Sequence, residues 1–238
     1  MRNTGYIVII VVLFGLIGYY AYSTVDESPS LPVALSGIRS VSIPLLAVDD
    51  NNNGLVIPIT VELSPGTGKV LVDIENPSFI LDTQDSMRLA VAEAAQMTNT
   101  DMSNYDVVFS VTTNISLIGG PSAGAAMTLA TMALLLDKQI DPDVAVTGTI
   151  EEGGYIGPVG GIKEKAEAAK NYGITLFVVP VGEAISKEPT ETCNKKTGNG
   201  WSQKECYITY NTVNISQETG LTVVEAGTIS DAMKYILV

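Results

Sequence analysis

The sequence contains no histidine among its 238 residues. This absence excludes catalytic sites built on an imidazole base, such as the Ser-His-Asp and Cys-His arrangements, and all metal sites that need a histidine ligand. An enzyme with this sequence would therefore need a lysine or a carboxylate as its base.

Basic residues are scarce, with 13 lysines and arginines against 26 aspartates and glutamates, and the formal net charge is -13. An acidic chain repels the phosphate backbone of nucleic acids. We therefore expect no nucleic-acid partner.

Only two cysteines are present, Cys193 and Cys206, and they do not form a CxxC redox or metal motif. They are close in sequence, so we favour a disulfide that closes a short loop; the alternative is two unrelated free thiols. A disulfide would require an oxidising compartment. We predict no metal site and no cofactor.

Charged residues are missing from residues 5–22, and the uncharged stretch continues to Val25. This length is enough to cross a bilayer as a helix, and the tyrosine cluster near its end is typical of a membrane interface. We therefore predict a transmembrane anchor over residues 5–25. The alternative is a cleaved signal peptide, since "AYS" at 21–23 has small residues at suitable spacing.

The charges on the two sides of this span differ in sign, with Arg2 before it and Asp26 and Glu27 after it. By the positive-inside rule, residues 1–4 lie in the cytoplasm and the bulk of the chain lies outside. We therefore expect a single-pass protein of the cell membrane with an extracytoplasmic domain.

Residues 26–36 indicate a short linker, and residues 37–238 are expected to form one domain of the α+β class, because strand-like runs alternate with helical ones. Within that domain, the polar stretch at about 182–218 reads as an insertion. It holds both cysteines and the only tryptophan.

Three strands in meander order are predicted near the start of the domain, over residues 39–48, 55–64 and 69–75. Helices are predicted over residues 85–97, 122–136 and 162–172, the last ending at a glycine.

Ser122 lies in "GGPSAG", directly before an apolar helical run. A serine here is often a simple helix cap, because its hydroxyl accepts a hydrogen bond from the first turn. It can also be a nucleophile, since unsatisfied N–H groups at a helix start can stabilise an oxyanion. The candidate donors are the N–H groups of Gly120, Ser122 and Ala123.

Lys165 is the candidate base for this serine. In "GGIKEKAEAAK", helical periodicity places Lys165 on one face with Ile162, Ala166 and Ala169, whereas Lys163 falls on another. A lysine on an apolar face is either a side chain that extends to solvent or an amine kept neutral by burial. The second possibility would supply the base that the absent histidine cannot.

Three segments of the sequence resemble the proteolytic domain of the Lon protease family. They are "GGPSAGAAMTLA", "DVAVTGTIEEGGYIGPVGGIKEKAEAAKNYGI" and "FVVP", and they occur in the family's order and at its separation. The resemblance covers residues 36–180 and resumes at 220–237. It implies a compact α+β domain that commonly assembles into hexameric rings.

The resemblance also implies a Ser-Lys dyad peptidase in which Ser122 is the nucleophile and Lys165, the second lysine of "KEK", is the base. The family's strand threonine matches Thr147, which would hold the lysine in place. The expected partners are protein or peptide substrates, the membrane through the N-terminal helix, and further copies of this chain.

The sequence departs from the family pattern in three ways. No phosphate-binding loop is present, because the "GTGK" stretch has Leu63 where that motif needs a glycine. Many relatives carry an acidic residue where this chain has Gly119, and histidines where it has Val108 and Ser110. The insertion is the third departure.

These observations predict an ATP-independent, membrane-anchored serine endopeptidase that acts on unfolded or flexible proteins outside the cytoplasm. The alternatives are a catalytically silent assembly or receptor module with the same fold, and a peptidase that mainly cleaves itself.

Overall fold

The computed structural model describes residues 37–238 except for 74–77, 112–116 and 199–200. The predicted anchor over 5–25 and the linker over 26–36 lie outside the described residues. Within the described ranges, none of the helices is long and apolar enough to cross a membrane.

The first sheet has four strands in the order β1-β2-β5-β3. Their bounds are β1 Arg39–Val48, β2 Gly54–Pro65, β5 Tyr105–Val111 and β3 Val70–Val72. Side chains of β5 alternate strictly between buried and half-buried, because one face of the strand packs into the core.

The predicted meander is wrong at its third strand. β3 does not pair with β2 but runs parallel to β5, on the far side of it. The turn between β2 and β3 is drawn toward β5, because the Asp106 carboxylate accepts the Thr67 N–H at 2.7 Å and the Lys69 N–H at 2.9 Å. A parallel pair needs a crossover connection, and helix α2, Leu81–Thr98, provides it.

The second sheet is entirely parallel, in the order β13-β10-β7. Its strands are β7 Val144–Val146, β10 Leu176–Pro180 and β13 Thr222–Ala226. Helix α4, Ile162–Tyr172, lies between β7 and β10 in the chain and packs onto β2 and β1 of the first sheet. This placement brings α4 between two sheets and fixes the face that it buries.

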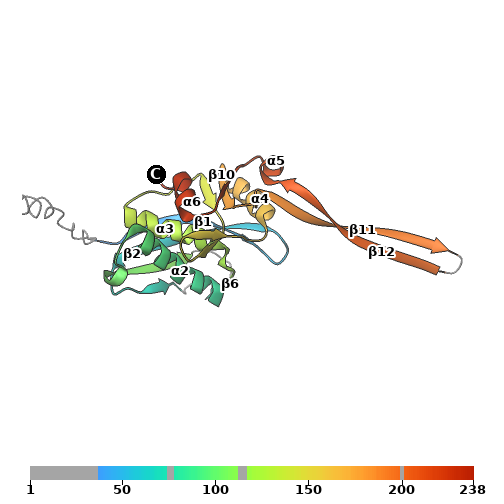
Figure 1. Ribbon diagram of the computed structural model, residues 1–238. Helices are drawn as coiled ribbons and strands as arrows, with labels where there is room; N and C mark the ends of the chain where they lie inside the picture. Colours follow the sequence, from blue (N-terminus) through green and yellow to red (C-terminus); the bar gives the residue numbers. More distant parts are fainter. Residues whose placement is uncertain (1–36, 74–77, 112–116, 199–200) are drawn as a thin grey trace, which may run out of the picture. The chain divides into compact units, whose positions relative to one another are not determined.

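The remaining elements are short, apart from the helices α3 and α6. They are β4 Ser78–Phe79, β6 Leu117–Ile118, β8 Thr149–Glu151, β9 Tyr155–Gly157, η1 Met102–Asn104, η2 Pro121–Ala123, α3 Gly124–Leu136, α5 Ile215–Thr219 and α6 Ile229–Ile236. Helix α3 is buried from Gly124 to Leu134 and contacts α2, β1 and α6 (Figure 1). A helix that is apolar on all sides belongs in the centre of a core. The α+β class is confirmed.

A long hairpin occupies the segment that the sequence marked as an insertion. It consists of β11, Ile185–Gly198, and β12, Trp201–Asn214, and it extends away from the rest of the domain (Figure 1). Cys193 and Cys206 are directly opposite each other in the ladder and are joined by a disulfide. The sequence had suggested no regular structure here, since polar residues hide the strand pattern.

Replacement of Gly54 by alanine is expected to destabilise the domain, because the new methyl group would overlap the carbonyl group of Glu164 in α4. Forcing extra volume into such a contact typically costs about 1–3 kcal/mol. Urea unfolding of Gly54→Ala and of the control Gly160→Ala, whose methyl group would meet nothing within 4 Å, provides the comparison. Equal midpoints for the two variants would contradict this packing.

Candidate active site

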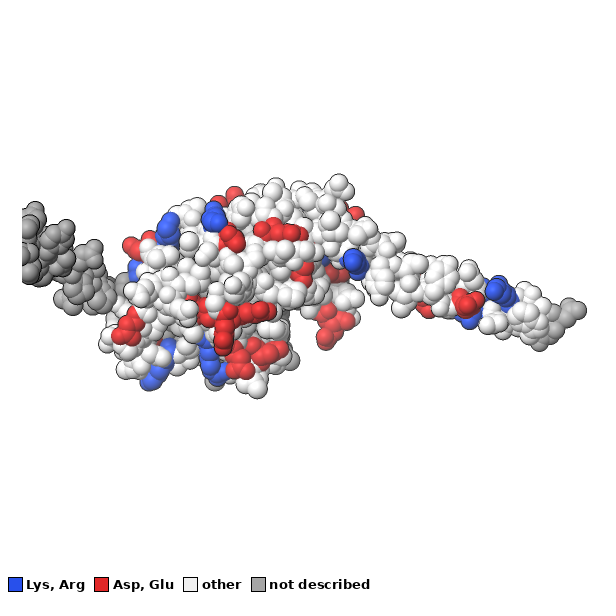
Figure 2. Space-filling view, in the orientation of Figure 1, with Lys and Arg blue, Asp and Glu red and all other residues white. Residues whose placement is uncertain are grey.

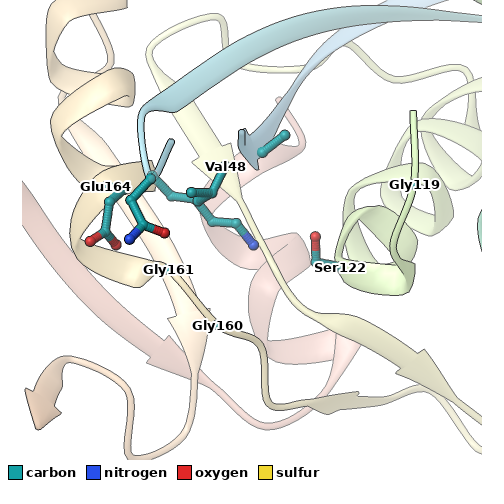
Figure 3. A pocket seen from close by; sticks show the side chains of 9 residues that line it. Val48, Gly119, Ser122, Gly160, Gly161 and Glu164 are labelled. Atoms are coloured by element: carbon teal, nitrogen blue, oxygen red, sulfur yellow. The ribbon is translucent and has the colours of Figure 1, made fainter. Parts of the chain in front are cut away.

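Ser122 lies in a short 3-10 turn, Pro121–Ala123, which leads into α3. The capping position of α3 is Ala123, and no side-chain hydrogen bond caps this helix. The interpretation of Ser122 as a helix cap is therefore wrong. Its hydroxyl group instead faces a cavity, opposite Val48 and Gly161 (Figure 3).

The backbone around Ser122 is tied to the segment after β7. The Ser122 carbonyl accepts the Gly148 N–H at 2.9 Å, and the Gly148 carbonyl accepts the Ala125 N–H at 3.1 Å. Gly148 has a φ of +145°, and a side chain there would collide with Ile156. Glycine is thus required for this approach, which fixes the serine turn against the strand end.

Lys165 is buried, with 3% of its surface exposed. Ile162, Ala166 and Ala169 are buried with it on the same face of α4, so the face predicted from helical periodicity is confirmed. Lys163, on another face, lies 3.6 Å from a carboxylate oxygen of Glu218. The two lysines of "KEK" therefore have different environments, and only Lys165 faces the core.

Thr147 connects the buried lysine to the serine turn. The Lys165 Nζ donates a hydrogen bond to Thr147 Oγ1 at 3.3 Å, and the Thr147 hydroxyl donates to the Ser122 carbonyl, also at 3.3 Å. One buried hydroxyl group thus contacts both partners of the predicted dyad. The structure brings Ser122, Lys165 and Thr147 together as the sequence analysis expected.

Burial lowers the pKa of Lys165 from its ordinary value of 10.5 to about 8. Removal from water penalises the charged ammonium form, while the negative charge of Glu183 acts in the opposite direction. A lysine with a pKa near 8 has a substantial neutral fraction at neutral to mildly alkaline pH. It can therefore accept a proton from a nearby hydroxyl group.

A cavity of about 460 Å³ holds the two reactive groups (Figure 3). Its lining comes from the end of β1, the turn before α3, the glycines before α4, and α4 itself. The lining residues are Ala47, Val48, Asn52, Gly119, Ser122, Gly160, Gly161, Glu164 and Lys165. Within the glycine-rich segment 153–161, Tyr155 starts the second strand of a hairpin, and Gly160 and Gly161 line the cavity.

Of the predicted oxyanion donors, the Gly120 N–H already has a partner in this structure. It donates to the Asp82 carboxylate at 3.3 Å, and the Thr83 hydroxyl donates to the Gly120 carbonyl, also at 3.3 Å. Gly120 therefore acts here as the point where α2 holds the serine turn. The N–H groups of Ser122 and Ala123 remain predictions as oxyanion donors.

Two acidic residues near the site were missed by the sequence analysis. Asp82 belongs to the first turn of α2, which begins at Leu81 instead of the predicted residue 85. Glu183 follows β10, and its Oε1 accepts the Val159 N–H at 2.9 Å, while Oε2 is buried without a hydrogen-bond partner among the described residues. Burial raises the pKa of Glu183. Asp82 could have been found from the sequence, because acidic residues are typical of the first turn of a helix. Glu183 could not, because only the tertiary structure brings it to the site.

One cluster of potential metal ligands occurs in the described part of the chain, formed by Glu191, Cys193 and Cys206. The two sulfur atoms are joined to each other, so neither is available as a thiolate ligand. This cluster does not fit a metal ion.

Comparison with known proteins identifies the family. The model of the Lon protease (S16) C-terminal proteolytic domain matches residues 53–195. The chain belongs to the Lon protease family. As a Lon S16 peptidase domain, it is a serine protease.

Several members of the Lon family are similar to this chain over part of their length. The archaeal Lon protease of Methanocaldococcus jannaschii is 30% identical over 141 residues, which are 58% of this chain and 22% of that protein. The Lon protease of Phenylobacterium zucineum is 32% identical over 144 residues, 58% of this chain and 18% of that protein. The chain thus spans about a fifth of the length of these relatives.

A shorter segment is more similar. The peroxisomal Lon protease homolog 2 of Eremothecium gossypii is 52% identical over 63 residues, 26% of this chain and 6% of that protein.

Substitution of Lys165 by methionine is expected to stabilise the fold at pH 7 while it abolishes catalysis. Between pH 8 and 10.5 the unfolded chain binds more protons than the folded one, because burial lowers the pKa of Lys165 to about 8. Wild-type stability therefore rises with pH across this window, and the cost of burying the ammonium group is greatest below it. At pH 7 we expect the variant to gain on the order of 3 kcal/mol, since one pKa unit corresponds to about 1.4 kcal/mol.

Urea unfolding of wild type and Lys165→Met at pH 7 and at pH 9.5 measures this effect. The advantage of the variant should shrink at the higher pH. If the difference in the free energy of unfolding between the two proteins did not depend on pH, burial of the charged Lys165 side chain would not cost folding free energy.

Substitution of Thr147 by valine should lower kcat about 10- to 100-fold, because the lysine amine loses its acceptor and the serine turn loses a tie to the strand end. KM should change little, since Thr147 does not line the cavity. The exposed Thr175, next to β10, supplies the matched control Thr175→Val. A normal kcat in Thr147→Val would show that Thr147 does not position Lys165 or the serine turn.

Proposed function

We propose that this Lon-family chain is an ATP-independent, membrane-anchored endopeptidase that uses a Ser122–Lys165 dyad on unfolded or flexible proteins outside the cytoplasm. The observation that carries the dyad is the buried amine of Lys165. It has a lowered pKa, lies in the same cavity as the Ser122 hydroxyl group and shares Thr147 with the serine turn.

In the proposed reaction, neutral Lys165 removes the proton from Ser122, and the serine oxygen attacks the scissile carbonyl carbon. The resulting oxyanion accepts hydrogen bonds from backbone N–H groups of the serine turn, with Ser122 and Ala123 as candidates. The protonated lysine then gives its proton to the leaving amine, and an acyl-enzyme remains on Ser122. Water, activated by the same lysine, hydrolyses this ester and regenerates the free serine.

The proposed location rests on two features of the chain. Residues 5–22 carry no charge and are long enough to span a bilayer. The disulfide between Cys193 and Cys206 fits an oxidising compartment, in which such bonds persist. An outward-facing domain on a single membrane anchor satisfies both.

The proposed independence from ATP rests on the sequence, because "GTGK" lacks the first glycine of a phosphate-binding loop. Substrates should then be chains that are already flexible, since unfolding a stable domain requires work that this peptidase does not obtain from a nucleotide. We also propose that copies of the chain assemble into a ring, as the family resemblance implies.

Covalent labelling tests the dyad. The full-length chain in detergent is treated with a serine-reactive phosphonate, and its intact mass is measured beside Ser122→Ala and Lys165→Met. One adduct on wild type and none on either variant is expected, at a rate that rises with pH through about 8 as Lys165 becomes neutral.

Equal labelling of Lys165→Met would refute the assigned base. Absence of labelling in folded wild-type protein would favour the silent module. Cleavage of a casein substrate with and without ATP and magnesium tests nucleotide independence, for which equal rates are expected.

A further inference from the structure

The two faces of the β11–β12 hairpin differ in composition. Residues directly opposite each other in the ladder point to the same side, and successive residues alternate. Pro189 opposes Tyr210 on the side that also carries the disulfide. We call this side the disulfide face, and its apolar members are Ile185, Pro189, Cys193, Cys206, Ile208 and Tyr210.

These apolar side chains are exposed to solvent, apart from the half-buried Cys193. Ile208 is 62% exposed and Tyr210 is 67% exposed. On the opposite face, the pairs in the same part of the hairpin are mostly polar, with Thr190 against Thr209 and Thr192 against Tyr207, and Tyr207 is the aromatic residue among them. Exposed apolar side chains gathered on one side of a two-stranded arm indicate a binding surface, although Lys187 and Glu191 lie among them on this face.

The base of the hairpin lies near the active-site cavity. A second cavity of about 390 Å³ is lined by Ile185, Ser186 and Lys187 from the base of the hairpin and, among others, by Gly160 and Gly161. The same two glycines line the cavity of Ser122. The base of the hairpin therefore lines the second cavity, which shares Gly160 and Gly161 with the cavity of Ser122. The apolar residues of the disulfide face lie in the half of the hairpin nearer to these cavities.

The disulfide face is also basic, although the chain as a whole is acidic. It carries Lys187, Lys195 and Lys204 against the single carboxylate of Glu191. Lys195 and Lys204 are directly opposite each other, and like charges in this position destabilise a ladder. Figure 2 shows basic and acidic side chains together along the hairpin. A partner with acidic side chains would offset this repulsion.

We propose that the disulfide face binds an extended segment of the polypeptide substrate, rich in apolar and acidic side chains, and directs it through the second cavity to Ser122. This proposal rests on the peptidase function proposed above. A substrate is the occupant that connects the face with the cavities, since whatever covers Ile185 also borders the second cavity. A lipid surface would instead meet the tip, where the face is polar and basic.

The length of the arm gives the proposal a measurable consequence. Strands of this kind rise about 3.3 Å per residue, so fourteen residues reach roughly 46 Å. A hexapeptide fills the two cavities at most and cannot extend along the arm. Only long substrates should respond to changes on the disulfide face.

The kinetic test compares the double variant Ile208→Ser/Tyr210→Ser with Tyr207→Ser, which removes a tyrosine of the same strand from the opposite face. The full chain is assayed with carboxymethylated α-lactalbumin, an acidic protein that stays unfolded, and with a fluorogenic hexapeptide. KM for the unfolded protein should rise about tenfold in the double variant alone, with hexapeptide cleavage unchanged in both variants. Equal KM values in all three proteins, or the same loss in Tyr207→Ser, would overturn the proposal.

A photocrosslinking test identifies the occupant without requiring catalysis. Benzoylphenylalanine replaces Tyr210, or Tyr207 as the control, in the Ser122→Ala chain held in nanodiscs of phosphatidylcholine and phosphatidylglycerol. Crosslinks from position 210 to the unfolded protein support the proposal, even if wild type proves inactive. Crosslinks to a second copy of the chain or to lipid refute it.

Discussion

The burial of one amine is the constraint on which the site depends. Lys165 is almost completely removed from water, and that burial lowers its pKa to about 8. The same burial costs folding free energy, because an ammonium group loses its hydration. Thr147 supplies the hydrogen bond that the amine would otherwise lack and joins it to the backbone of Ser122. The rest of the domain must hold α4, the end of β7 and the serine turn close enough for this one hydroxyl group to reach both.

Close backbone approaches provide that rigidity, and glycines make them possible. Gly54 lets the start of β2 lie against the carbonyl of Glu164, the residue before the lysine. Gly148 lets the segment after β7 exchange hydrogen bonds with the serine turn. From the other side, α2 holds the turn through Asp82 and Thr83. Main-chain contacts thus place the turn of Ser122 and the helix of Lys165, the proposed nucleophile and base.

The sequence predicted the parts of this arrangement that depend on local periodicity. The buried face of α4, with Lys165 on it, follows from helical spacing alone, and the family motifs located Ser122 and Thr147. The position of β3 could not be found this way, because Asp106 redirects the preceding turn through contacts made across 37 to 39 residues of chain. Glu183 was missed for the same reason, since it reaches Val159 and the field of Lys165 only after β10 is in place. The hairpin was missed because its mostly exposed strands lack the alternation of buried and polar residues that predicts a strand.

Because the chain has no histidine, the proposed base is a buried lysine, and this choice affects where a substrate can bind. A lysine base works near neutral pH only where burial disfavours its charged form, as it does at Lys165. The cavity of about 460 Å³ beside it holds only a short part of an extended chain. A peptidase of this type gains selectivity most readily from a surface outside the cavity that holds the next part of the substrate. The disulfide-linked hairpin presents such a surface, since its apolar and basic face borders a second cavity that shares Gly160 and Gly161 with the cavity of the amine.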